Sequence, residues 1–368
     1  MNWLIAVSGV LIVATVLPFI RRPAWWMRLF DFPRSQITVI AIAAVAALAW
    51  KFDGSSSLHV GTLVLMSFCT AYQAWELSRY TKLRKIQSLA SATQDPERRV
   101  RVLIGNVLMT NRNVDQYLEL IREEKPDIVI LAEPGAYWEQ TLRQIECDYP
   151  FSIKCPLENT YGMLLYSKLP LSNEQIRFRV ENGIPSFTAI VKLRNEDEFE
   201  LHSIHPRPPH IGVDTETRDA ELILVAKEVK DLPRAVMVTG DLNDVAWSHT
   251  TRLFLRISGM LDPRIGRMFC NTFHAKYFLF RWPLDHVFHS RAFRLVELRR
   301  LRRTDSDHFP VVVELSYEPE VKQDHERPHA TKADIVEARE KIELAKNGNS
   351  ADPGTEIARE GHEKEQPL

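Results

Sequence analysis

The pair Asp307-His308 stands just before a short apolar run at residues 311–313. A carboxylate can bind a metal ion and a histidine can act as a general base, so this pair offers both at the start of an expected strand. An Asp-His pair on its own is common and carries little information. It is informative here because polar residues also stand at the ends of other apolar runs, in an order that fits metal-assisted cleavage of a phosphoester.

Polar side chains border several further apolar runs of the chain. They belong to Asn106, Glu133, His205, Asp241, Asn243 and Asp285. A glutamate directly after a buried strand is costly to desolvate unless it is paired or binds a cation. Each residue taken singly has a structural explanation, such as a helix cap, a turn or a salt bridge. Because every one lies where a strand is expected to meet a loop, the set predicts one functional site.

The residue types suit a hard divalent cation. Mg²⁺ (or Mn²⁺) takes carboxylate and amide oxygens, and Glu133, Asn106 and Asp307 carry such oxygens. These residues are therefore the predicted metal ligands. A soft-metal centre is not expected, because no His/Cys pair has the spacing of a zinc site.

The remaining polar residues suit the proton transfer and the charge of phosphoester hydrolysis. A histidine held by a carboxylate can take a proton from water, and His308 with Asp285 forms such a pair. Negative charge gathers on the phosphoryl oxygens in the transition state, and Asn243 and His205 are donors that could meet it.

Composition divides the chain into regions. Of 368 residues, 45% are hydrophobic and 26% are charged, and the net charge is -1, so overall charge favours neither nucleic acid nor a membrane surface as partner. Residues 1–80 are apolar and aromatic, whereas the end of the chain is strongly polar. The cysteines (Cys69, Cys147, Cys155 and Cys270) lack metal-like spacing. We expect reduced thiols, with a bond between Cys147 and Cys155 as the alternative.

Three apolar segments, at residues 3–20, 37–50 and 60–75, predict three transmembrane helices within residues 1–80. Tryptophans stand at or near the segment ends, where interfacial aromatics are expected, at Trp25, Trp26, Trp50 and Trp75. The alternatives are a cleaved signal peptide for the first segment and a buried helical domain for all three. The first segment lacks the basic start and the Ala-x-Ala exit of a signal peptide.

Basic residues near the segment ends predict the orientation in the membrane. The first loop contains Arg21, Arg22, Arg28 and Arg34, and the third segment is followed by Arg79, Lys82, Arg84 and Lys85. The second loop holds only Lys51, with Asp53. The pattern predicts a multi-pass membrane protein (of the inner membrane, if bacterial) with a cytoplasmic catalytic domain. If the third segment does not span, that domain lies on the other side.

Residues 81–100 are predicted to be a juxtamembrane linker, and residues 318–368 a charged, largely disordered tail with a helix at 333–346. The domain between them, residues 101–317, is predicted to be of the α/β class. Its expected helices are 114–123 and 217–230. Its expected strands are 102–104, 128–131, 163–166, 187–191, 199–204, 236–238, 286–288 and 311–313. Many strands with few helices indicate two packed sheets flanked by helices.

Seven short motifs in this domain resemble, in their joint order, the endonuclease/exonuclease/phosphatase family, which includes type I deoxyribonucleases, exonuclease III-like enzymes and neutral sphingomyelinases. The motifs lie at residues 105–107, 126–133, 162–171, 203–206, 240–243, 284–287 and 306–310. The resemblance implies a four-layer α/β sandwich with its site at one rim of the two sheets, in a membrane-anchored bacterial type.

The resemblance also implies roles for single residues. Asn106, Glu133 and Asp307 correspond to the metal shell, and Asp241 and Asn243 to groups that orient the nucleophile and the phosphate. His308, oriented by Asp285, corresponds to the catalytic histidine, and His205 to a second histidine.

Three functions remain open at this point. The first is a membrane-tethered, Mg²⁺-dependent phosphodiesterase or phosphatase, with a lipid headgroup as one candidate substrate. The second is a nuclease on DNA or RNA, with phosphates held by Arg207 or by the basic residues of 299–303. The third is an inactive membrane scaffold. No protein partner can be read from the sequence.

Overall fold

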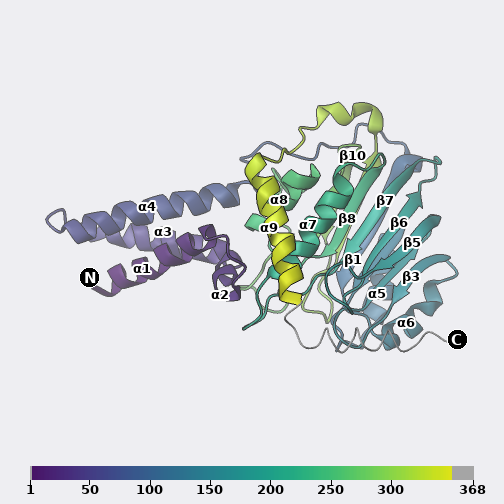
Figure 1. Ribbon diagram of the computed structural model, residues 1–368, viewed down its shortest axis with the longest axis horizontal. Helices are drawn as coiled ribbons and strands as arrows, with labels where there is room; N and C mark the ends of the chain where they lie inside the picture. The colour runs from purple at the N-terminus through teal and green to yellow at the C-terminus, as the bar shows by residue number, and fades with distance from the viewer. Residues whose placement is uncertain (1, 350–368) are drawn as a thin grey trace.

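The computed structural model describes residues 2–349, with side chains through residue 346. Two mixed β-sheets pack face to face and are flanked by helices, which confirms the predicted α/β sandwich (Figure 1). One sheet has the order β10-β11-β1-β2-β4-β3 and the other the order β5-β6-β7-β8-β9.

The strands of the first sheet are β1 (Arg99–Asn106), β2 (Ile128–Ala132), β3 (Phe151–Cys155), β4 (Met163–Ser167), β10 (Phe293–Arg300) and β11 (Val311–Tyr317). Those of the second are β5 (Leu171–Arg177), β6 (Ser186–Lys192), β7 (Glu198–Ile204), β8 (Ala235–Asp241) and β9 (Asp285–His289). All eight predicted runs lie in strands. The three strands that were not predicted, β3, β5 and β10, are edge strands, whose exposed faces interrupt the apolar pattern.

Alternation along each strand divides the apolar residues between three layers of core. In β1, Val102 and Ile104 face the other sheet, whereas Leu103 faces outward. The outward face of the first sheet is covered by α5 (Asp115–Glu124) and α6 (Ala136–Leu142). The second sheet is covered by α7 (Glu216–Lys230) and α8 (His249–Ser258), and α9 (Lys332–Asn349) packs on these two helices. The predicted helices 114–123 and 217–230 correspond to α5 and α7.

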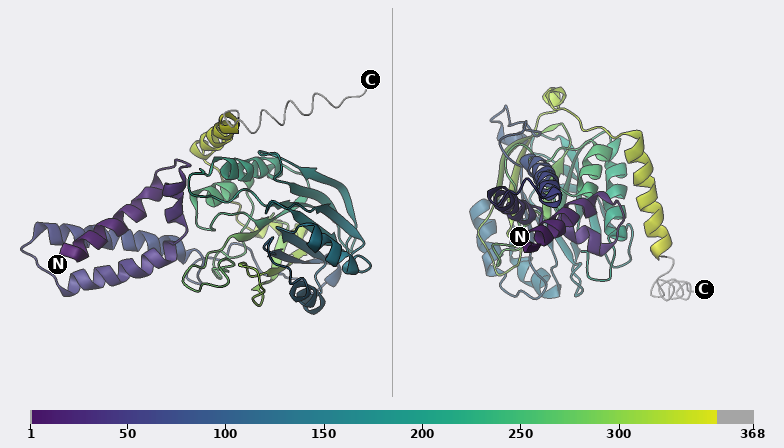
Figure 2. Two further views of the ribbon diagram at one scale, coloured as in Figure 1. Left: turned by 90° about the horizontal axis from the view of Figure 1, so that it is seen from below. Right: turned by 90° about the vertical axis from the view of Figure 1, so that its left-hand side faces the viewer.

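Helices α1 (Asn2–Val16), α3 (Arg34–Trp50) and α4 (Ser57–Ser78) form a bundle that projects from one end of the sandwich (Figures 1 and 2). Small and aliphatic side chains such as Ala41, Leu48 and Met66 fill its interior. Its outer surface is also apolar, since Val10, Val39 and Phe68 are 66%, 67% and 71% exposed.

Not every helix of the bundle has the length and hydropathy of a membrane span. Among the described residues, Asn2–Phe19 is long and apolar enough, and Trp25–Asp31 with Arg34–Trp50 forms a second candidate that is bent by 69°. This test does not single out α4, so the three spans remain a prediction.

The segment between α1 and α3 folds back against the sandwich. It contains the short helix α2 (Trp25–Arg28) and the 3-10 turn η2 (Leu29–Asp31). The Trp247 indole Nε1 donates to the Asp31 carbonyl at 2.7 Å, and the Trp25 backbone N–H donates to Asp214 Oδ1 at 2.9 Å. The bundle and the sandwich are therefore packed together through this segment.

Both chain segments that flank the domain are part of its fold. Within the predicted linker, the Ser91 backbone N–H donates to the Leu295 carbonyl at 2.9 Å. Residues Lys332–Asn349 form α9, whose Ala338 and Ile342 are buried against α7 and α8. This helix corresponds to the one predicted at residues 333–346, and it completes the core of its neighbours instead of needing a core of its own. Residues 350–368 lie outside the described range. The four cysteines are free.

One buried carboxyl makes the stability of the fold depend on pH. Glu221 of α7 is 3% exposed, and burial raises its pKa to about 8 even though Arg179 opposes the shift. Between pH ~4.5 and ~8 the unfolded chain therefore loses this proton while the folded chain keeps it, so folding stability falls as pH rises through this window.

We expect Glu221→Gln to remove this loss. The melting temperature of the variant should exceed that of the wild type at pH ~8.5 by at least about 2–4 °C and should differ less at pH ~5. Thermal unfolding followed by circular dichroism across this pH range measures the difference. Glu174→Gln, at an exposed position of β5, is the control. Parallel curves for Glu221→Gln and the wild type would contradict the assignment.

Candidate active site

Strand direction brings the predicted site residues to one rim of the sandwich. Strands β1 and β2 are parallel, so Asn106 at the end of β1 lies beside Ala132, the residue before Glu133. Strands β8 and β9 are antiparallel and pair Asp241 with Asp285. Strand β7 runs parallel to β8, which brings His205 to the same end.

His308 reaches this rim from the first sheet. Strand β11 runs antiparallel to β1, with Val311 opposite Ile104, so the residues just before β11 lie beside the end of β1. The two sheets thus contribute their polar strand ends to a common site.

The backbone at this rim adopts conformations that few residues tolerate. Glu133 and Asn243 have φ of 65° and 50°, in the left-handed region, and such outliers are frequent at functional sites. Gly240, with φ of 140°, precedes Asp241, and a Cβ there would lie 2.0 Å from the Ile204 carbonyl oxygen. A glycine is therefore required for β8 to approach β7 this closely.

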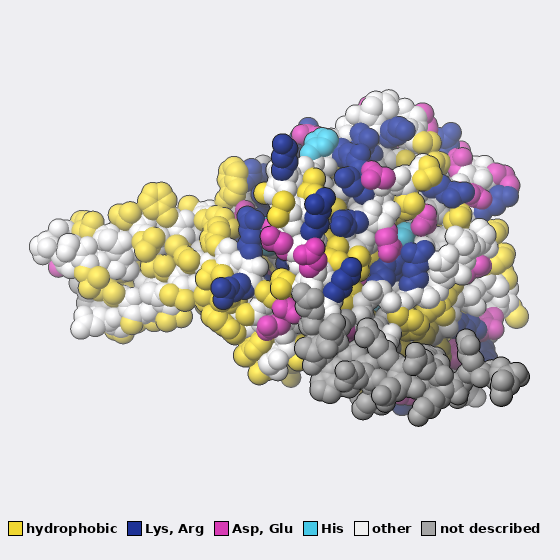
Figure 3. All heavy atoms as spheres, in the orientation of Figure 1, with side chains coloured by type: hydrophobic (Ala, Val, Ile, Leu, Met, Phe, Trp, Pro, Cys, Tyr) yellow, Lys and Arg dark blue, Asp and Glu magenta, His cyan; other side chains and the backbone are white. Residues whose placement is uncertain are grey.

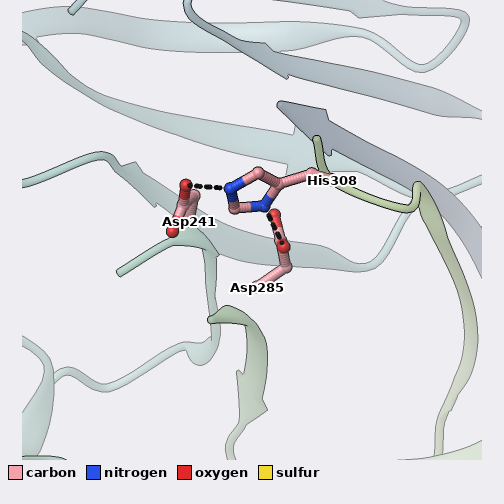
Figure 4. A group of neighbouring side chains, drawn as sticks. All are labelled: Asp241, Asp285 and His308. Carbon is pink, nitrogen blue, oxygen red and sulfur yellow. Dashed lines mark hydrogen bonds and ion pairs between the residues drawn. The ribbon is translucent and has the colours of Figure 1, made fainter. Parts of the chain in front are cut away.

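His308 lies between two carboxylates (Figure 4). Its Nδ1–H donates to Asp285 Oδ2 at 2.8 Å, and its Nε2 lies 3.5 Å from Asp241 Oδ2. Burial alone would lower the pKa of His308, but the charges of Asp285 and Asp241 outweigh burial and raise it to about 10. The ring is therefore an imidazolium at neutral pH in the absence of other cations.

Asn106 connects the two sheets across the rim. Its Nδ2 donates to Glu133 Oε1 at 2.7 Å and to Asp241 Oδ2 at 3.1 Å. Its Oδ1 accepts from the Leu108 backbone N–H at 2.9 Å. In this arrangement the amide nitrogen, and not the oxygen predicted to bind a cation, faces the carboxylates.

His205 lies behind the acidic residues and is 2% exposed. Its Nδ1 donates to the Asp241 carbonyl at 3.1 Å, which leaves Nε2 facing Glu133 Oε1 at 3.9 Å. The other predicted donor, Asn243, uses Nδ2 to bind the Pro206 carbonyl at 2.9 Å.

A cavity of about 650 Å³ opens onto the site. Five of the predicted residues line it, namely Glu133, Asp241, Asn243, Asp307 and His308. Asn106, His205 and Asp285 lie behind this surface and contact it through the hydrogen bonds and ion pairs given above. The structure therefore brings all eight predicted residues together, five at the cavity surface and three behind it.

Several residues that hold this site in place were not predicted from the sequence. Ser306 Oγ donates to the Asn106 carbonyl at 2.7 Å and accepts from the His308 backbone N–H at 3.0 Å. Arg264 donates to His286 Nδ1 at 2.7 Å and to Asp262 Oδ2 at 2.8 Å, which secures the start of β9. Their spacing in the sequence has no recognisable pattern, because the partners meet only in the folded domain.

Part of the cavity wall comes from the N-terminal region. Trp25, Leu29, Phe32, Pro33 and Gln36 all line the cavity opposite the catalytic domain. From the sequence this region was expected only to be an anchor, and no motif in it indicates a contact with residues some 200 positions away.

The donor set fits a divalent cation. The carboxylates of Glu133, Asp241 and Asp307 face one cavity, and its described lining residues include no Lys or Arg. Clustered negative charge of this kind is unfavourable unless a cation balances it. Carboxylate oxygens suit Mg²⁺ or Mn²⁺. Possible ligand atoms of Asp241, Asp285 and His308 also lie within 4.8 Å of one another. The hydrogen bond from His308 to Asp285 and its ion pair with Asp241 account for this closeness without a metal ion.

Residues 105–308 match the Endonuclease/Exonuclease/phosphatase family, and the chain belongs to this family. Its members are metal-dependent hydrolases of phosphoesters. A comparison with curated proteins gave no match.

Solved structures share the fold at low identity. A humanized D. rerio TDP2 is 14% identical over 59% of this chain and 99% of its own, with a TM-score of 0.50. The catalytic domain of human Nocturnin with bound sulfate is 15% identical over 64% and 98%, with a TM-score of 0.50. An endonuclease/exonuclease/phosphatase from Beutenbergia cavernae is 19% identical over 60% and 72%, with a TM-score of 0.49. At these identities the likeness to TDP2 and Nocturnin shows the fold alone.

The protonation of His308 tests this geometry directly. Asp285→Asn removes a charge from the ring nitrogen, so the pKa of His308 should fall by roughly 1–3 units and the imidazolium should lose its proton at a lower pH. Nuclear magnetic resonance of ¹³C-labelled histidines in metal-free protein follows the titration. Asp305→Asn, at an exposed aspartate bonded to Asn113, should leave it unchanged. A His308 titration that is equal in the wild type and Asp285→Asn would contradict the pairing.

Proposed function

We propose that the protein is a membrane-anchored, divalent-metal-dependent phosphoesterase. The observation that carries this proposal is the cavity in which the carboxylates of Glu133, Asp241 and Asp307 lie beside the His308–Asp285 pair. A phosphoester is itself an anion, and the described lining offers it no Lys or Arg. A cation held by these carboxylates is therefore needed to bring the substrate and the site together.

Each side chain then has a defined task. Glu133 and Asp307, with Asn106 after rotation of its amide, hold Mg²⁺ or Mn²⁺, which when bound offsets the charge of the phosphoryl oxygens. His308 takes a proton from the attacking water at Nε2, while Nδ1–H stays bonded to Asp285. Because the pKa of His308 is about 10 when the carboxylates are unbalanced, they must be neutralised before the ring can act as a base.

Two groups position the water and the phosphoryl group. Asp241 Oδ2 lies 3.5 Å from His308 Nε2 and is the acceptor that orients the water. Asn243 lines the cavity and donates to the phosphoryl oxygens through its remaining N–H, and His205 supports Asp241 from behind.

The apolar outer surface of the helical bundle supports membrane anchoring. Hydrophobic side chains cover the projecting helices, which carry almost no charge on the visible face (Figure 3). An exposed apolar surface of this extent is costly in water and favourable in lipid. Successive helices of the bundle run in opposite directions. The N-terminus and the α3–α4 loop therefore lie at the end of the bundle far from the sandwich (Figure 1). If all three helices span, the N-terminus and the α3–α4 loop lie on one side of the membrane and the catalytic domain on the other, as the predicted multi-pass topology requires.

The alternative functions have less support. Of the arginines considered for nucleic-acid binding, Arg207, Arg299 and Arg302 are paired with glutamates; Arg302 lies 2.9 Å from Glu119 and Arg207 lies 2.9 Å from Glu181. Paired arginines are poor phosphate ligands. An inactive scaffold has no need of a carboxylate cluster that is costly to bury, and the cluster here is complete.

We expect metal-dependent hydrolysis of bis-p-nitrophenyl phosphate or p-nitrophenyl phosphate by the full-length protein in detergent. Chelation with EDTA should abolish it and Mg²⁺ or Mn²⁺ should restore it. Glu133→Gln and His308→Ala should each lower kcat/KM by about 10²-fold or more, because one removes a metal ligand and the other the base.

Glu174→Gln and His329→Ala, at exposed positions, are matched controls that should retain activity. Thermal stabilisation by Mg²⁺ or Mn²⁺ gives a second measurement, which Glu133→Gln should lose and His308→Ala should keep. Activity that persists in EDTA, or survives in both site variants, would refute the proposed mechanism.

Topology can be tested with thiols. Cys147 is exposed in the catalytic domain, and Ser55→Cys places a thiol in the loop between α3 and α4. In spheroplasts that express this variant, a membrane-impermeant maleimide should label the thiol introduced by Ser55→Cys at once and Cys147 only after permeabilisation. The wild-type chain, which lacks the introduced thiol, is the control. Labelling of Cys147 in intact spheroplasts would place the catalytic domain outside.

A further inference from the structure

We propose that the substrate is an amphiphilic phosphoester of the bilayer, whose apolar chain lies against the α2–η2 segment while its phosphoryl group meets the carboxylates. This inference rests on the proposed function and adds the class of substrate. It would make the N-terminal region part of the substrate-binding site as well as an anchor.

The cavity has two chemically distinct parts. The acidic residues and His308 form one part, and the rest of the lining is mainly apolar and includes Trp25, Leu29, Phe32, Ile211, Phe280 and Trp282. Its volume of about 650 Å³ is in the usual range for a ligand pocket, and it exceeds what a phosphoryl group alone requires. A molecule that fills it therefore joins a phosphoester to an apolar group.

The apolar wall is held in place by specific contacts. The Thr215 backbone N–H donates to the Pro23 carbonyl at 2.9 Å, and Gln36 Nε2 donates to the Leu279 carbonyl at 2.6 Å. The rings of Phe32 and Trp282 meet edge to face with centroids 5.7 Å apart. These contacts connect the N-terminal segment to loops of the catalytic domain, so the wall belongs to a built site.

The mouth of the cavity continues into exposed apolar surface. Ile211, Phe278 and Leu279 are 87%, 76% and 69% exposed, and Leu279 is bonded to Gln36 in the first turns of α3. Hydrophobic side chains also continue from the bundle onto the part of the domain around α2 (Figure 3). With the bundle in a bilayer, this surface lies at the lipid interface. A lipid can then reach the carboxylates without leaving the membrane.

A nucleotide fits these observations less well. Its phosphates would need cationic side chains along a strand path, and the described lining has no Lys or Arg. Its base could stack on Trp25 or Trp282, since aromatic faces accept bases. The experiment therefore includes a nucleotide ester beside the alkyl esters.

The test compares kcat/KM for methyl and hexyl p-nitrophenyl phosphate, which differ only in chain length, with full-length protein in detergent. If the enzyme cleaves only monoesters, the same comparison is made with methyl and hexyl phosphate, and the release of inorganic phosphate is measured. We expect the hexyl ester to be preferred by at least about tenfold, because its methylenes leave water for the apolar wall. Leu29→Gln and Ile211→Gln should bring the hexyl-to-methyl ratio close to one.

The matched control is Leu58→Gln. Leu58 is 64% exposed, close to the 57% of Leu29, but it lies in the first turn of α4 at the far end of the bundle. This variant should keep the wild-type hexyl-to-methyl ratio of kcat/KM. Any effect of detergent on the longer ester should be the same in both proteins.

Three results would overturn the inference. Equal kcat/KM for hexyl and methyl esters in the wild type would leave the proposed function intact but remove the apolar subsite. Preference for p-nitrophenyl thymidine 5′-phosphate over the hexyl ester would mean that the apolar wall binds a stacked base and not an alkyl chain. No metal-dependent cleavage of any ester would refute the proposed function, and this inference with it.

Discussion

The arrangement of the rim depends on the balance of negative charge in a place with little water. Asp241 and Asp285 are 1% and 5% exposed, and His308, at 4%, lies between them as a cation. Buried carboxylates persist only when such partners compensate for lost hydration. The neighbouring residues serve this balance: Asn106 donates to two carboxylates, and Ser306 and Arg264 fix the chain on either side. Among the described residues that line the cavity, the outer carboxylates of Glu133 and Asp307 have no Lys or Arg beside them, which supports the proposed metal site.

A second chain of buried charges runs beneath the rim and connects it to the C-terminal helix. Arg218 of α7 donates to the Asn243 carbonyl at 2.9 Å and to Asp219 Oδ1 at 2.8 Å. Lys341 of α9 binds Asp219 Oδ2 at 2.7 Å. Burial alone would raise the pKa of Asp219, but Lys341 and Arg218 outweigh it and hold this pKa below its ordinary value. The segment after the sandwich therefore helps to hold the loop that carries Asn243.

The N-terminal helices have a role beyond attachment, because the segment between them forms a wall of the active-site cavity. Trp247 is fully buried and binds the Asp31 carbonyl, while Tyr80, just after α4, donates to the Ala246 carbonyl at 2.5 Å. The residues after Asn243 are thus held by two parts of the N-terminal region. In the proposed membrane-anchored enzyme, this coupling fixes the distance between the bilayer and the carboxylates, which a flexible tether would leave free.

Most strands, and the polar residues at their ends, were predictable from the sequence because alternation and strand-end polarity are local patterns. The polar strand ends alone predict that Glu133, Asp241 and His308 belong to one site. Other features emerged only from the folded chain: the edge strands β3, β5 and β10, the orientation of the Asn106 amide, the docking of α9 and the α2–η2 wall. Each of these depends on contacts between distant parts of the chain. Such long-range contacts produce no periodic pattern in the sequence of either segment. The fold class was therefore predictable from the sequence, whereas the shape of the cavity was not, because distant segments of the chain build its wall.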